Sequence, residues 1–268
     1  MEAPYILVML TSTIGAEECL RVASQVGRTL AQPVHVCHVE VGPGAIILPS
    51  QETLTEYEVE HMAERERAET EALRKLTADW ALDFGATTRL QVARGDEWRE
   101  LRHHRSKASL VILASPHTQP LGHRDALRAA LLRTRHPVIM VPPSWKGDFA
   151  RRLLVGWEDV PPLRRAVEAF APFLRQADQV DTVLIGQGEA AIAPARAALS
   201  PIAPKAAFRS ASADGRKTAA VLLDEARASH ADGIVMGAFR RGEILNWVVP
   251  GTSARLIQES FLPLLMSP

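Results

Sequence analysis

Aromatic residues are scarce in this sequence of 268 residues, and neither sign of charge prevails. Phe, Trp and Tyr make up 5% of the chain against 47% for all hydrophobic residues, so a core must consist mainly of Ala, Leu, Val and Ile. Such a core is typical of parallel sheets covered by helices. Lysine plus arginine equals aspartate plus glutamate, 31 against 31, which gives no long-range attraction to nucleic acid or to an anionic membrane. We expect neither partner.

Cysteine is rare as well. Cys19 and Cys37 form no Cys-x-x-Cys motif, and no cluster of histidine and cysteine has metal-ligand spacing. We therefore expect buried, reduced thiols and no metal site. The chain also lacks an apolar run of about 20 residues and a basic segment leading into a long apolar one at its start. These absences predict a cytoplasmic protein without a membrane span or a signal peptide.

Short apolar runs of strand length alternate with helical patterns throughout the chain. Several are apolar at consecutive positions, which indicates strands that are buried on both faces. The runs span residues 5–10, 33–41, 87–93, 109–115, 136–142, 152–157, 180–186, 205–211, 232–238 and 262–268. The same order of elements occurs twice, which predicts an α/β protein of two tandem, doubly wound, parallel five-stranded sheets. We expect domains at 1–143 and 151–268, joined by a polar turn at 142–151.

Other segments lead to further expectations. The charged segment 51–85 predicts a long helix with a solvated face that covers a sheet. Apolar residues at helical spacing over 162–177 predict one continuous helix. The last apolar runs of the two halves, 136–142 and 262–268, would lie at sheet edges and need cover. Pairing of the two domains within the chain and formation of a homodimer both satisfy this need.

Four stretches resemble the universal stress protein family in its tandem, two-domain form. In the second half they are RLLVGWEDVPPLRRAVEAF, HADGIVMGAF and TSARLIQESFLPLLMSP, and in the first half QVARGDEWRELRHHRSKASLVILAS. The resemblance implies a parallel sheet of order 3-2-1-4-5 in each domain, as in adenine nucleotide alpha hydrolase-like folds. It also implies pairing of the domains and, in many members, an ATP site at the strand ends.

Nucleotide-binding members of this family carry a glycine-rich loop before the last helix, in which backbone amides approach phosphate oxygens. In the second half of this chain the loop keeps its length, but Arg240 and Pro250 stand at two of the three glycine positions. An arginine can still bind phosphate through its guanidinium. The alternative is that the segment is only a capped helix entry. The candidate residues of this loop are Gly237, Arg240, Arg241, Gly251, Thr252 and Ser253.

The end of the first strand in each half supplies the other candidates. Glu158 stands where nucleotide-binding members have aspartate, and its carboxylate can accept hydrogen bonds from ribose hydroxyls. Its neighbour Trp157 either packs on an adenine or closes the core. In the first half, Thr11 occupies the carboxylate position and the loop is shorter, with Arg124 at its third glycine position. We therefore expect the first half to bind no nucleotide and to act in pairing and stability.

Three functions remain open from the sequence. The first is a regulatory stress-response protein that binds ATP or another adenine nucleotide in its C-terminal half, with Mg²⁺ accompanying the nucleotide. The second is an interaction module without nucleotide. The third is a weak ATPase, for which Glu158 is the candidate acid. We find no catalytic motif and expect a binding protein rather than an enzyme.

Overall fold

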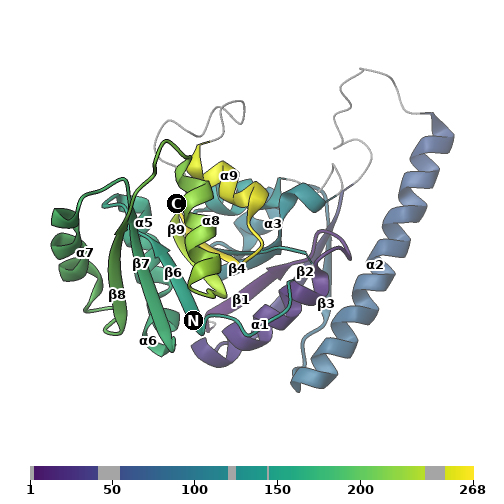
Figure 1. Cartoon of the computed structure of the whole chain (residues 1–268). Helices are drawn as coiled ribbons and strands as arrows, with labels where there is room; N and C mark the ends of the chain where they lie inside the picture. Colours follow the sequence, from purple (N-terminus) through teal and green to yellow (C-terminus); the bar gives the residue numbers. More distant parts are fainter. Residues whose placement is uncertain (1–2, 42–54, 120–124, 144, 239–250) are drawn as a thin grey trace. The chain divides into compact units, whose positions relative to one another are not determined.

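The computed structural model describes residues 3–41, 55–119, 125–143, 145–238 and 251–268. Contacts divide the chain into two compact units, Met1–His136 and Pro137–Pro268. Each unit is an α/β structure in which helices follow strands, as the alternating sequence pattern predicts (Figure 1). Among the helices of the described segments, none is both long and apolar enough to cross a lipid bilayer.

The first unit contains a parallel sheet in the order β3-β2-β1-β4. Its strands are β1 (Tyr5–Met9), β2 (Val34–Glu40), β3 (Leu90–Arg94) and β4 (Ala108–Ala114). Every residue of β1 is buried, as expected for a central strand covered on both faces. The order agrees with the predicted 3-2-1-4 part of the domain.

Helices of the first unit follow the predicted crossovers. They are α1 (Ala16–Leu30), α2 (Glu56–Phe84), α3 (Glu97–His104), α4 (Ala126–Arg128), a short 3₁₀ turn Pro116–Thr118 and a π-helical segment Ala129–Thr134. Thr55 and Glu58 form a capping box that satisfies backbone amides at the start of α2. The buried residues of α2 form a narrow stripe at steps of three or four residues, so most of the helix surface is solvated, as predicted.

The second unit contains the strand order β5-β10-β9-β6-β7-β8. Its strands are β5 (Val138–Val141), β6 (Arg152–Gly156), β7 (Gln179–Ile185), β8 (Ala206–Ala211), β9 (Gly233–Gly237) and β10 (Leu264–Ser267). The order β8-β7-β6-β9-β10 confirms the predicted 3-2-1-4-5 arrangement. β5, the last strand of the first sequence repeat, pairs antiparallel with β10, and all the other pairs in this unit are parallel.

This antiparallel pair explains how the two apolar edge strands are covered. Ile139 lies opposite Leu265, and Val138 lies opposite Met266. All four side chains are fully buried. Pairing within the chain, one of the two arrangements that the sequence left open, therefore satisfies both edges without a second molecule.

Helices of the second unit depart from prediction at one place. They are α5 (Pro161–Ala169), α6 (Ala171–Gln176), α7 (Ile192–Leu199), α8 (Thr218–Ala228), α9 (Thr252–Glu259) and a 3₁₀ turn Glu189–Ala191. The prediction of one continuous helix over 162–177 was wrong, because the helix breaks at Phe170. Pro172 has no amide hydrogen and its ring crowds the preceding turn, so the chain restarts as a second helix. Both Phe170 and Phe173 remain buried across the break.

The segment predicted as a polar connecting turn is anchored by aromatic residues. Trp145 and Phe149 are both buried, and their rings make an edge contact at 6.4 Å between centroids. Phe149 also contacts Phe173 of α6 at 5.8 Å. The turn is therefore packed against the second unit and is not simply a solvated link.

Asp232, just before β9, makes the second unit sensitive to pH. Its carboxylate accepts hydrogen bonds from the backbone amides of Arg151 and Arg152 at 3.0 and 2.9 Å. Burial raises the pKa of Asp232 to about 6, although these backbone hydrogen bonds oppose the shift. A raised native pKa means that the native state binds a proton more tightly than the unfolded chain does. Stability from this group is therefore present at low pH and is lost as pH rises through about 6.

We expect Asp232→Asn to remove this dependence, because the amide oxygen can still accept from both backbone groups. When the pH rises from 4.5 to 7, the unfolding free energy of the variant should increase by about 1–2 kcal/mol relative to that of the parent, because only the parent loses stability. This value is smaller than the full pKa shift would give, because the carboxylate is partly exposed to solvent. Urea unfolding at both pH values measures the difference. Asp178→Asn is the matched control, since Asp178 pairs with Arg151 on the surface. An equal change in both variants would contradict the prediction.

Candidate functional site

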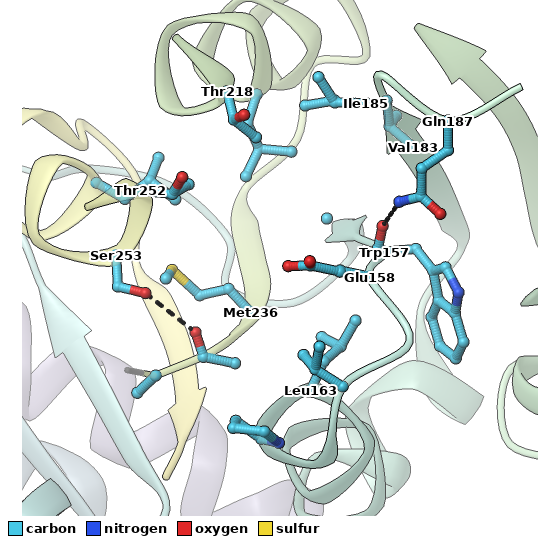
Figure 2. A pocket seen from close by; sticks show the side chains of 17 residues that line it. Trp157, Glu158, Leu163, Val183, Ile185, Gln187, Thr218, Met236, Thr252 and Ser253 are labelled. Atoms are coloured by element: carbon cyan, nitrogen blue, oxygen red, sulfur yellow. Dashed lines mark hydrogen bonds between the residues drawn. The ribbon is translucent and has the colours of Figure 1, made fainter. Parts of the chain in front are cut away.

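A pocket of about 420 Å³ lies in the second unit, at the carboxyl ends of β6, β7 and β9. The first residues of α5, α8 and α9 complete its wall (Figure 2). Open parallel sheets place ligand sites at this edge, beside the strand where the order of connections reverses. That strand is β6, which has β7 on one side and β9 on the other. The fold therefore positions the pocket where a small molecule is expected.

Glu158 places a carboxylate in this pocket. It follows β6 by two residues, and in Figure 2 its carboxylate points into the cavity between Met236 and Thr218. The Trp157 ring lies on the other side of the chain, directed away from Glu158 (Figure 2), and is 5% exposed. Of the two alternatives for Trp157, the structure favours closing the core, although the residue also lines the edge of the pocket.

Gly237 has a structural reason to be glycine. A Cβ at this position would lie 2.7 Å from the backbone nitrogen of Leu163 and 3.0 Å from the Cβ of Pro162. The end of β9 thus packs directly against the first turn of α5, and no other residue fits. The sequence pattern suggested that this glycine gives room to a phosphate. In the structure it gives room to a helix, which brings the α5 terminus to the pocket.

Hydroxyl groups gather at the helix starts around the pocket. Ser253 donates a hydrogen bond to the carbonyl oxygen of Gly237 at 3.4 Å, which ties the start of α9 to the end of β9 (Figure 2). Thr252 is the first residue of α9 and Thr218 the first of α8. Backbone amides at these starts carry partial positive charge. This part of the pocket therefore suits an anionic group.

Apolar side chains form the remaining wall. They include those of Val160, Leu163, Val183, Ile185, Leu222 and Met236. At the rim, Gln187 donates a hydrogen bond from its amide nitrogen to the Trp157 carbonyl oxygen at 3.0 Å. The pocket thus combines an apolar surface, one carboxylate and two helix starts, which is the mixture that fits a planar base, a polyhydroxyl sugar and a phosphate.

The structure brings most of the predicted site residues together. Five of them line the pocket: Trp157, Glu158, Gly237, Thr252 and Ser253. Gly251 is the residue that precedes α9 and adopts an extended conformation there. Arg240 and Arg241, like Pro250 of the same loop, lie outside the described residues.

Sequence reasoning missed Thr218, Leu222 and Gln187. Thr218 and Leu222 come from α8, one turn apart on one face, and Leu222 packs over Gly156 so closely that a Cβ there would lie 3.0 Å from its methyl group. Gln187 stands two residues beyond β7. Their position in the sequence could have identified them, because each is near a strand end or a helix start of the second repeat. Such places converge on one edge of a parallel sheet.

Asp159, the neighbour of Glu158, does not add a second carboxylate to the pocket. Its side chain accepts a hydrogen bond from the Arg164 guanidinium at 2.6 Å, and this pairing lowers the pKa of Asp159. Among the described residues that line the pocket, Glu158 is therefore the carboxylate.

At the corresponding place in the first unit, a glutamine side chain is hydrogen-bonded to the polar groups that follow β1. Thr11, the counterpart of Glu158, donates a hydrogen bond to the Gln119 side-chain oxygen at 2.7 Å, and Ser12 donates to the same oxygen at 2.7 Å. The Gln119 amide nitrogen donates to the carbonyl oxygen of Ile14 at 3.0 Å. All three side chains, Thr11, Ser12 and Gln119, are buried. The protein's own amide therefore satisfies the polar groups at the end of β1. Arg124 lies outside the described residues.

Comparison with solved structures identifies the architecture. A universal stress protein from Archaeoglobus fulgidus superposes with a TM-score of 0.68 over 97% of this chain and 94% of its own, at 14% identity. This chain has the tandem universal stress protein fold. No protein-family model matches the sequence, and neither does any curated protein.

Smaller universal stress proteins align with about half of the chain. One, from Archaeoglobus fulgidus in complex with dAMP, covers 52% of this chain and 98% of its own length at 16% identity and a TM-score of 0.37. Another, from Arabidopsis thaliana with AMP bound, covers 53% and 93% at 11% identity and a TM-score of 0.36.

Proposed function

We propose that this chain is a regulatory protein of the universal stress type whose second unit binds an adenine nucleotide in the pocket beside Glu158. The observation that carries the proposal is the combination, in one pocket of about 420 Å³, of an apolar wall, a carboxylate and two helix starts. Small-molecule sites span about 300–1,000 Å³, so the volume suits a ligand of this size.

Each part of a nucleotide has a matching part of the wall. The adenine packs on Val183, Ile185 and Leu222, and Glu158 accepts hydrogen bonds from the ribose hydroxyls. The phosphate lies toward the starts of α8 and α9, where the Thr252 and Ser253 hydroxyls and the backbone amides are donors. ATP is the nucleotide that the family resemblance implies, and in this proposal Mg²⁺ accompanies it. The stress-response role rests on the same resemblance, and the cytoplasmic location is the expectation drawn from the sequence.

The first unit has a different part in this proposal. Its Thr11 and Ser12 hydroxyls are bonded to Gln119, and we expect this unit to act in pairing and stability without a nucleotide of its own. An interaction module without nucleotide describes the first unit well. The proposed function differs from a nucleotide-free interaction module only in that the second unit binds a ligand.

A direct test begins with the ligand that the protein carries after purification. Freshly purified full-length protein is denatured and the released small molecules are identified, and the protein is then titrated calorimetrically with AMP and with ATP, with and without Mg²⁺. We expect stoichiometric binding of an adenine nucleotide at one site per chain. Absence of binding by any adenine nucleotide would favour the interaction module.

Two substitutions locate the site. Thr218→Trp places an indole at the mouth of the pocket from an exposed position, and we expect it to weaken nucleotide binding at least about tenfold, which is 1.4 kcal/mol. Glu158→Ala removes the group that accepts hydrogen bonds from the ribose, and this substitution by itself should weaken nucleotide binding about tenfold or more. The matched control is Glu168→Ala, an exposed glutamate of α5 that does not line the pocket. Production of ADP that is lost in Glu158→Ala would add slow hydrolysis to the function.

A further inference from the structure

A second group of chemically active side chains lies in the first unit, between β2 and α3. Cys37 projects from β2, and Glu100 and His104 project from α3. The sulfur of Cys37, a carboxylate oxygen of Glu100 and a ring nitrogen of His104 all lie within 4.8 Å of one another. Cys37 is 1% exposed and His104 is 3% exposed. The group is therefore a compact, nearly enclosed set of one sulfur, one oxygen and one nitrogen donor.

Regular secondary structure produces this arrangement. Glu100 and His104 are four residues apart in a helix, so they share one face, one turn from each other. Side chains alternate along β2, which puts Cys37 and His38 on opposite faces of the sheet. His38 contacts Glu66 of α2 at 3.5 Å, and Cys37 faces α3 instead. Cys37 is far from Glu100 and His104 in sequence, which is why spacing alone did not reveal the cluster.

The histidine is oriented as metal-ligating histidines are. Its Nε2 atom lies 2.9 Å from the Glu100 carboxylate, within the cluster. Its Nδ1 atom lies 2.5 Å from the hydroxyl of Tyr5 on β1. The Tyr5 ring is in turn stacked on His35 with 4.0 Å between ring centroids. A partner at Nδ1 holds the ring with Nε2 directed toward the other donors, which is the usual support for a ligating imidazole.

We propose that Cys37, Glu100 and His104 bind one zinc ion in the first unit. Thiolate, imidazole and carboxylate are the donors that Zn²⁺ takes, and a mixed set with sulfur discriminates against magnesium and calcium. Binding forms a bond from the metal to the Cys37 sulfur, and the thiol proton is released to solvent. The Nε2 atom of His104 gives up its hydrogen when it exchanges its contact with Glu100 for the metal, and the hydrogen of the neutral ring then lies on Nδ1, which donates to the Tyr5 hydroxyl oxygen.

Gln91 indicates where the fourth ligand comes from. It is the register partner of Cys37 on β3, so the two side chains share a face of the sheet. Its amide lies 3.5 Å from the Glu100 carboxylate, and Gln91 is exposed. Either the amide oxygen or a water molecule at this position completes a tetrahedron, and the metal enters from this side. The site belongs to the first unit and does not depend on nucleotide binding.

The test uses the full-length protein after removal of metals by a chelator. Co²⁺ is added first, because a thiolate ligand gives a charge-transfer band in the near ultraviolet and a four-coordinate site gives intense visible bands. We expect saturation at one equivalent and displacement of Co²⁺ by Zn²⁺. Cys37→Ser should abolish the charge-transfer band, and the matched variant Cys19→Ser, which alters a buried thiol of α1 outside the cluster, should retain it.

Variants with little effect on packing provide the second measurement. Glu100→Gln is nearly isosteric at a partly exposed residue and should weaken Zn²⁺ binding at least about tenfold, and Tyr5→Phe, which removes only the positioning hydroxyl, should weaken it about 10- to 100-fold. Zn²⁺ should raise the melting temperature of the parent more than that of Glu100→Gln. No cobalt band in the parent, or a band that persists in Cys37→Ser, would overturn the proposal. So would a zinc affinity that is unchanged in Glu100→Gln.

Discussion

Replacing Gly237 with valine should destabilise the second unit by about 3 kcal/mol or more. The new Cβ would lie 2.7 Å from the backbone nitrogen of Leu163, and a backbone atom at a helix start cannot turn aside as a flexible side chain can. Either β9 or α5 must shift, and both carry residues that line the pocket. We therefore expect a loss of nucleotide binding together with the loss of stability. Urea unfolding and calorimetric titration measure the two effects.

Gly188→Ala is the matched control for this prediction. Gly188 has φ −69° and ψ 167°, a conformation that alanine adopts readily, and a Cβ there has no heavy atom within 4 Å. The unfolding free energy of the Gly188→Ala variant should stay within about 0.5 kcal/mol of that of the parent. If Gly237→Val were as stable as Gly188→Ala, the close approach of β9 to α5 would be wrong, and a phosphate-related reason for the glycine would return.

Leu265→Asp should have the largest effect on stability, at about 4 kcal/mol or more. Leu265 is fully buried, lies between Ile139 of β5 and Val235 of β9, and packs on Gly233 so closely that a Cβ on the glycine would be 3.2 Å from its methyl group. A carboxylate at this position would be shielded from solvent and has no positive partner among these neighbours. We expect the variant to lose cooperative unfolding or to aggregate, as followed by circular dichroism and size-exclusion chromatography.

Leu265→Met tests whether burial is the cause. Methionine keeps the volume and the apolar character, so its cost should stay below about 1.5 kcal/mol. A mild effect of Leu265→Asp, comparable with that of the methionine variant, would show that the β5–β10 pair is exposed in solution. In that case the edges of the two apolar strands would need another partner, and the homodimer that the sequence left open would become the better explanation.

Much of the second-unit site could be predicted from the sequence because its residues follow strand ends. Glu158 comes directly after an apolar run, and Thr252 and Ser253 open a helix. The resemblance to a known loop then suggested the roles that we propose for them. The helix break at Phe170 could also have been predicted, since Pro172 stands inside the apolar pattern and proline disrupts a helix interior. The apolar periodicity concealed it, because the residues on both sides of the break are buried.

Other features depend on pairs that no local pattern connects. Gln119 bonds to Thr11 and Ser12 only because the segment after β4 returns to the end of β1. The reason for Gly237 is an α5 terminus that is remote in sequence. Cys37 meets Glu100 and His104 only because strand alternation and helix rotation direct them into the same space.

The sequence by itself determined the repeated order of strands and helices, because runs of apolar residues must be buried and their lengths and spacing select the elements. It also determined which strand ends carry polar groups. Only the tertiary structure decided which of those groups meet, which of them line a pocket and which are hydrogen-bonded to the chain itself. Side chains brought together at a sheet edge come from distant segments, and their contacts depend on distances of a few ångströms that no one-dimensional pattern records.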